Sequence, residues 1–121
     1  MLISNINWVS ESAKEAEVKV SDGQNEIVLF CYPCDYSENQ DTDEYIHPLE
    51  IKNFQKSDES SVAITKTTSS HYGYKIVGLV DSLEDSIIIV GGLKFEIDMP
   101  IPSWAEEGDM VEFESMRFDL W

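Results

Sequence analysis

The feature that most limits the fold of this chain is a two-residue period of apolar side chains. Apolar and charged residues alternate in residues 15–20 and 93–99, and further strand-length apolar runs occupy residues 26–32, 72–80 and 87–90. A period of two places apolar side chains on one face of a β-strand, whereas an amphipathic helix needs a period near 3.6. The pattern therefore predicts a β-rich protein.

Turn-forming residues separate these runs. Residues 21–24, Ser-Asp-Gly-Gln, lie between the first two runs and predict a hairpin, and Gly91-Gly92 predicts a bend. Near the end of the chain the apolar side chains move from odd positions in residues 111–113 to even positions in residues 116–120. A strand changes face only with an extra residue, so we expect a β-bulge near Ser115, or alternatively two separate short strands.

Signals for helices are few. Pro48 interrupts residues 43–54 and limits them to one or two helical turns, and residues 10–16 could form another short turn. About seven or eight strands without long helices favour a mainly β fold, a small antiparallel β-barrel or sandwich with at most one or two short helices. A chain of 121 residues without a linker or repeat is expected to form one β-rich domain, residues 1–121.

The second constraint is charge. The chain has 24 Asp and Glu against 8 Lys and Arg, a formal net charge of -16, while 42% hydrophobic residues indicate a folded chain. Folded, it would carry one net negative charge per roughly 400 Å² of surface. Such a surface repels phosphates, so we expect no direct binding to nucleic acid or to an anionic membrane. The expected partner is a cationic protein.

The expected compartment follows from segments that the sequence lacks. The first Lys is Lys14, so the opening residues have no basic region of a secretion signal, and no apolar run approaches the ~20 residues of a membrane span. Two cysteines do not make a disulfide framework. The sequence therefore predicts a cytoplasmic protein that does not enter a membrane.

Cys31 and Cys34 form a CxxC motif. Redox enzymes place this motif at a helix N-terminus, whereas here it ends an expected strand and acidic residues follow, which disfavours a thiolate. Twelve residues separate Cys34 from His47, but a zinc site would need the distant His71 as its fourth ligand. A metal site formed by Cys31, Cys34, His47 and His71 is therefore only a weak alternative.

Signatures of catalysis are missing from the sequence. It contains no GxSxG, HExxH or phosphate-loop pattern, and with 24 acidic residues adjacent carboxylates cannot nominate a catalytic pair. We therefore expect no enzymatic activity and no cofactor.

Acidic and aromatic residues are grouped in the expected turns. Residues 35–44 hold five carboxylates and no basic residue, and a second group lies beside Trp104. Close carboxylates repel one another, and a partner's Lys and Arg would relieve that repulsion, whereas the alternative is a solvated loop that maintains solubility. The candidate partner-binding residues are Asp35, Tyr36, Glu38, Asp41, Asp43, Glu44, Tyr45, Trp104, Glu106 and Glu107.

A small, strongly acidic single domain without a catalytic signature resembles the immunity proteins of bacterial toxin systems, including those of contact-dependent growth inhibition. Residues 108–113 and 117–120 resemble the last strands of OB-like or SH3-like barrels, and this likeness covers residues 72–121. The resemblance implies one-to-one binding that blocks the active site of a basic nuclease toxin, an RNase or a DNase. No functional residue is transferred by a motif.

The leading hypothesis is an immunity protein that neutralises a cationic nuclease domain. Its loop carboxylates would replace the phosphates of the substrate, or would bind beside the active site and exclude substrate sterically. A second hypothesis is a non-enzymatic adaptor or DNA mimic that binds another basic protein. The third is a metal or thiol protein centred on Cys31 and Cys34.

Overall fold

Within residues 1–68 and 70–121, which the computed structural model describes, the regular elements are all β-strands, and the expected mainly β fold is confirmed. No helix of this part is long and apolar enough to cross a membrane. The strands are β1 (Leu2–Ser10), β2 (Glu15–Ser21), β3 (Glu26–Cys31), β4 (His47–Leu49), β5 (Lys52–Lys56), β6 (Ala63–Lys66), β7 (Tyr74–Ser82), β8 (Ile87–Val90), β9 (Leu93–Glu96), β10 (Met110–Ser115) and β11 (Arg117–Leu120).

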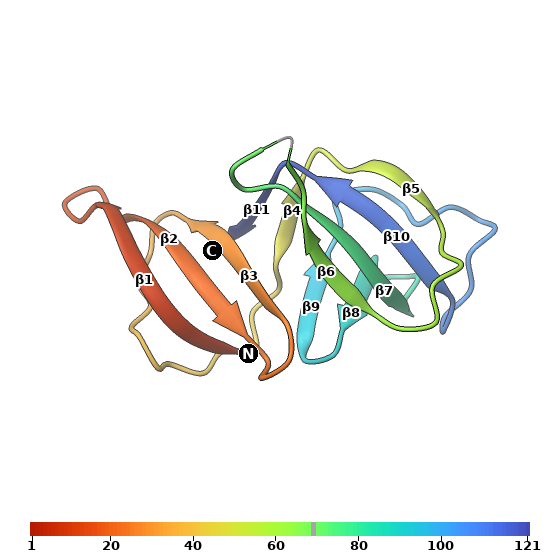
Figure 1. The fold of residues 1–121 in the computed structure, drawn as a ribbon, viewed down its shortest axis with the longest axis horizontal. Coiled ribbons are helices and arrows are strands. Elements are labelled where there is room, and N and C mark those ends of the chain that lie inside the picture. The colour runs from red at the N-terminus through yellow and green to blue at the C-terminus, as the bar shows by residue number, and fades with distance from the viewer. Residues whose placement is uncertain (69) are drawn as a thin grey trace.

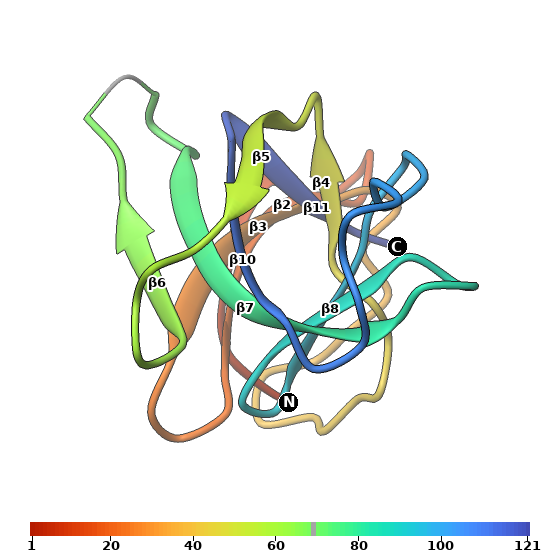
Figure 2. The same ribbon diagram turned by 90° about the vertical axis from the view of Figure 1, so that its right-hand side faces the viewer.

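The strands form two sheets arranged like a sandwich and not as a closed barrel (Figure 1). The first sheet has the order β1-β2-β3-β11-β4 and the second β5-β10-β7-β8-β9, with β6 also paired to β7. Figure 2 shows β6 on the side of β7 away from β10. Pairing is antiparallel except between β11 and β3, and a parallel bridge between Ile46 and Phe95 joins the two sheets.

The alternating runs of the sequence form the core. The predicted hairpin is confirmed as β2 and β3, where buried Val18 lies opposite buried Leu29. Phe95 of β9 meets Phe113 of β10 and Phe118 of β11 at ring-centroid distances of 6.3 and 5.8 Å. Aromatic side chains from both sheets therefore share one apolar core.

The chain passes directly from one sheet to the other near its end. β10 belongs to the second sheet and β11 to the first, and exposed Met116 lies between them. The buried Ser115 hydroxyl donates to the Leu49 carbonyl and accepts a hydrogen bond from the Arg117 amide. The bulge expected near Ser115 is therefore wrong, and the alternative of two short strands is confirmed, because a new sheet begins where the apolar side chains change parity.

The helical turns that were possible in residues 43–54 do not form, whereas the short turn expected in residues 10–16 is present, with the Lys14 amide donating to the Glu11 carbonyl at 3.1 Å. Residues 43–54 contain β4 and β5, and Pro48 is accommodated because β4 lies at the end of the strand order in the first sheet. Residues 11–14 turn between β1 and β2. The sequence pattern missed β1, whose pairing with β2 has two register shifts that disturb the alternation.

Asp22 joins turns of the two sheets. Its carboxylate accepts hydrogen bonds from the amides of Gln24 and Asn25 at 2.9 and 2.7 Å, and from the amide of Gly92 in the β8–β9 turn at 2.8 Å. Gly91 has a φ of 57°, and an added Cβ there would collide with the Asp22 carboxylate. Partial burial raises the pKa of Asp22, but the amide hydrogen bonds outweigh it and lower the pKa to about 2.

We predict that Asp22→Ala lowers the free energy of unfolding at pH 7 by about 1–3 kcal/mol, because three backbone donors lose a charged acceptor. The pKa of Asp22 is about 2, below its ordinary 3.8, so its contribution is full above pH 3.8 and is lost as the pH falls through 2. Urea unfolding between pH 2 and 7 measures both effects. Asp58→Ala, at an exposed carboxylate, is the control; an equal loss there would contradict the role of Asp22.

Candidate functional site

The acidic segment 35–44 lies along the outer edge of β1 (Figure 1). The Ile3 amide donates to the Gln40 carbonyl at 2.8 Å, and the Asn39 amide donates to the Ile3 carbonyl at 2.7 Å. The Glu38 carboxylate accepts a hydrogen bond from the Ile6 amide at 3.2 Å. The segment therefore covers part of a sheet edge, as well as presenting carboxylates.

The five carboxylates of this segment differ in their partners. Asp35 pairs with Lys14 at 2.8 Å, Asp41 lies 3.4 Å from the Met1 amine, and Glu38 is engaged by β1. The carboxylates of Asp43 and Glu44 are exposed and form no ion pair with a described residue. These two are the side chains of the segment most available to a partner.

Tyr36 within the segment and Tyr45 directly after it also differ. Tyr36 is half-buried against the core, and its hydroxyl donates to the Trp121 carbonyl at 3.4 Å. Burial, followed by the charge of Glu44, raises the pKa of Tyr36. Tyr45 is exposed, and its ring centroid lies 5.2 Å from the Lys94 ammonium group. Tyr45 can therefore contact a partner in its present position, whereas Tyr36 would have to leave the core.

The second acidic group lies on the loop between β9 and β10. Trp104 is exposed and packs against Phe54, with 6.1 Å between the ring centroids. The Glu107 carboxylate accepts a hydrogen bond from the Leu83 amide at 3.2 Å. Glu106 is exposed beside them. In Figure 1 this loop lies at the right of the molecule and segment 35–44 at the left, so the structure does not bring the predicted binding residues together.

The four residues of the suggested zinc site do not form one cluster. Cys31 and Cys34 are buried free thiols, and burial, with smaller effects of Cys34 and Asp35, raises the pKa of Cys31. His47 lies on β4, whereas His71 is exposed, 3.8 Å from the Glu17 carboxylate. In the described part of the chain no three His, Cys, Asp or Glu residues are grouped to hold a metal ion.

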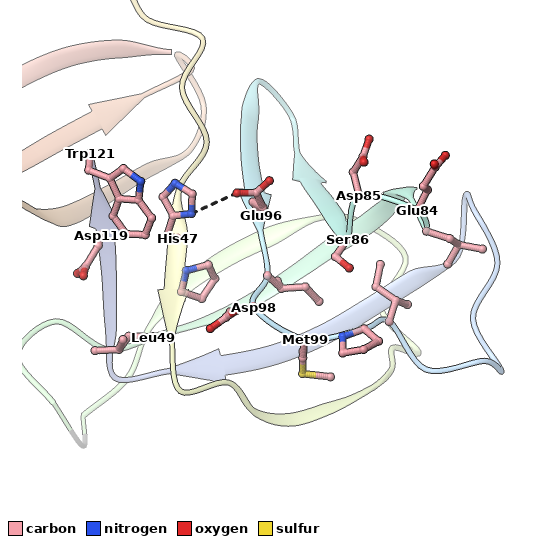
Figure 3. A pocket seen from close by; sticks show the side chains of 15 residues that line it. His47, Leu49, Glu84, Asp85, Ser86, Glu96, Asp98, Met99, Asp119 and Trp121 are labelled. Atoms are coloured by element: carbon pink, nitrogen blue, oxygen red, sulfur yellow. Dashed lines mark ion pairs between the residues drawn. The ribbon is translucent and has the colours of Figure 1, made fainter.

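A groove of about 740 Å³ lies where the two sheets meet (Figure 3). It is bounded by β4 and the end of β11 on one side, and by the β7–β8 turn and residues 96–101 on the other. Apolar side chains contribute to its lining, and five of the fifteen lining residues carry carboxylates, with no Lys or Arg among them. The carboxylates are Glu84, Asp85, Glu96, Asp98 and Asp119.

His47 and Trp121 stack at one end of this groove. Their ring centroids are 3.6 Å apart with an interplanar angle of 6°, and His47 Nδ1 lies 3.6 Å from the Glu96 carboxylate. Burial lowers the pKa of His47 and outweighs the opposite effects of Glu96, Asp119 and Glu44. The lowered pKa favours the neutral imidazole, which does not compensate the carboxylate charge of the groove.

Sequence reasoning missed the groove because four separate segments build it: residues 47–49, 83–86, 96–101 and 119–121. Three of these segments supply one or two carboxylates each, and residues 47–49 supply none. The adjacent acids Glu84-Asp85 were a signal, but nothing local connects them with β4 or β11.

Comparisons with protein-family models, curated proteins and solved structures gave no match to this chain. The resemblance to immunity proteins therefore rests on size, charge and strand pattern. Any functional conclusion must come from the geometry of the described surface.

We predict that Cys31 and Cys34 react slowly with iodoacetamide at pH 8 in the folded protein and rapidly in urea. Neither thiol is exposed, and the raised pKa of Cys31 disfavours its thiolate. Mass spectrometry counts the alkylated thiols with time. Rapid labelling of the folded protein would contradict the burial of the two thiols and favour the thiol hypothesis.

We predict that the His47 ring titrates below 6.5, its ordinary value, in an NMR titration. Because the folded-state pKa is lowered, the stabilising contribution is full above 6.5 and decreases as the pH falls through 6.5 towards the folded-state pKa. The free energy of unfolding should fall over this range in the wild type and less steeply in His47→Gln. Identical slopes would show that the imidazole is not desolvated in the folded protein.

Proposed function

We propose that this chain is a non-enzymatic inhibitor that binds a cationic protein domain in the cytoplasm. Its partner is a basic nuclease toxin, an RNase or a DNase, of the kind that the immunity proteins it resembles neutralise. The observation that carries this proposal is that few acidic side chains are paired with a Lys or Arg of the chain itself. Among the residues that the structure describes, Lys and Arg side chains form ion pairs with only three of the 24 acidic residues: Asp35, Glu112 and Asp119.

Uncompensated charge of this size acts first on the encounter between two proteins. The exposed area of 6740 Å² carries a net charge of -16, so a basic surface is attracted before contact. In the complex, carboxylates would take the positions of substrate phosphates against the Lys and Arg of the nuclease. Asp43 and Glu44 suit this role because their carboxylates are exposed, and the exposed Tyr45 would pack against the nuclease beside them.

A second candidate is an adaptor or DNA mimic that binds another basic protein. The separation of the two acidic groups favours it, because a molecule with acidic surfaces at two ends can contact two basic proteins or one extended basic surface. The gene neighbourhood discriminates between the candidates. An adjacent toxin gene that encodes a basic C-terminal domain favours the inhibitor.

Co-expression with the product of the neighbouring gene, followed by affinity purification, tests the function itself. We expect a cationic protein to co-purify and its nuclease activity to be suppressed in the complex. Recovery of this chain alone from every such pair would contradict the inhibitor.

The electrostatic mechanism has its own prediction. Asp43→Lys with Glu44→Lys should slow association with the nuclease roughly tenfold at low salt, with a smaller effect on dissociation, because steering acts before contact. Surface plasmon resonance over a range of salt concentrations measures both rates. Asp58→Lys with Glu59→Lys makes the same charge change at other exposed positions, and it should slow association less. Association rates that are independent of salt would discard the mechanism.

A further inference from the structure

The groove where the sheets meet exposes large apolar side chains. Leu49, Leu83 and Trp121 all line it, with exposed fractions of 46%, 39% and 60%. Apolar surface gathered in a concavity of several hundred Å³ is typical of binding sites, whereas single exposed apolar residues are ordinary. The shape and lining therefore suit a ligand with an apolar part.

The carboxylates of the groove lack cationic partners, with one exception. Asp119 accepts two hydrogen bonds from the Arg117 guanidinium group, at 2.8 and 2.9 Å. The other four form no ion pair with a described Lys or Arg: Glu84, Asp85, Glu96 and Asp98. A ligand that covered them without supplying positive charge would bury unpaired carboxylates, which is costly.

We infer that this groove holds a segment of the cationic partner protein in which an apolar side chain is flanked by Lys or Arg. The inference rests on the proposed function, and it names the surface and the chemistry of the contact. The apolar side chain packs against Leu49 and Trp121, and the flanking cations pair with Glu96 and Asp98.

Charge selects this occupant over a second copy of the chain. A copy with a net charge of -16 would bring further carboxylates to an already acidic rim. Among the described residues that line the groove, only His47 could carry a positive charge, and its lowered pKa favours the neutral imidazole. The positive charge that the groove lacks must therefore come from the partner.

The first test uses three capped hexapeptides that alternate Arg with Leu, Arg with Ser, and Glu with Leu. In NMR titrations of the whole chain, we expect the Arg–Leu peptide to shift the backbone amide signals of the non-proline residues in segments 47–49, 83–86, 96–101 and 119–121. The Arg–Ser peptide should bind more weakly and the Glu–Leu peptide should not bind. Shifts that avoid these residues, or equal binding of the two Arg peptides, would overturn the inference.

Matched variants separate the groove from general attraction. Glu96→Gln with Asp98→Asn should weaken Arg–Leu binding roughly threefold to tenfold, as expected for the loss of two exposed ion pairs. Asp58→Asn with Glu59→Gln removes the same charge at exposed positions outside the groove. Equal weakening by both pairs would overturn the inference.

Leu49→Ser supplies a variant that leaves the charge unchanged. Leu49 is exposed, so we expect the melting temperature to change little, while the Arg–Leu peptide loses affinity and the Arg–Ser peptide does not. An unchanged affinity for Arg–Leu would show that the apolar lining contributes nothing and would overturn the inference.

The experiments also distinguish failure of the groove inference from failure of the proposed inhibitor function. If a basic nuclease co-purifies and binds Glu96→Gln with Asp98→Asn as tightly as the wild type, the groove inference fails and the inhibitor stands. If no cationic protein is bound but the Arg–Leu peptide maps to the groove, the inhibitor fails and the groove stands.

Discussion

The passage of the chain between the two sheets at residues 115–117 is the constraint on which the rest of the structure depends. It places Phe113 and Phe118 in one core although they belong to different sheets. A sheet change leaves polar backbone groups near the core, and these require partners. The buried Ser115 hydroxyl bonds to the Leu49 carbonyl and the Arg117 amide, so the crossing also fixes β4 beside β11.

The acidic residues are compatible with this fold because they stay out of the core. Every fully buried large side chain of the described chain is apolar, and the carboxylates lie on loops, sheet edges and outward faces. Some of them stabilise the fold: Asp22 joins two turns, and Glu38 accepts a hydrogen bond at the edge of β1. The carboxylates therefore differ in their effect on the fold. Those without a partner inside the protein are the ones that a cationic partner would stabilise.

The sequence predicts those features of the fold that are determined by residues close together in the chain. The alternation of apolar residues predicts the hairpin of β2 and β3. The change of parity near Ser115 marks the sheet crossing, but by itself it fits either a β-bulge or two short strands. β1 was missed because irregular pairing disturbs its alternation. The groove could not be predicted, since its carboxylates come from distant segments and their grouping depends on how the sheets meet.

The two kinds of acidic surface suit different stages of recognition. Exposed carboxylates such as Asp43 and Glu44 act at a distance, so they accelerate encounter with any basic protein and select poorly among such proteins. The groove adds an apolar lining beside its carboxylates, and burial of an apolar side chain acts only after contact. Since most differences in affinity between related complexes lie in dissociation, the proposed complex would owe its selectivity among basic partners to the groove more than to segment 35–44.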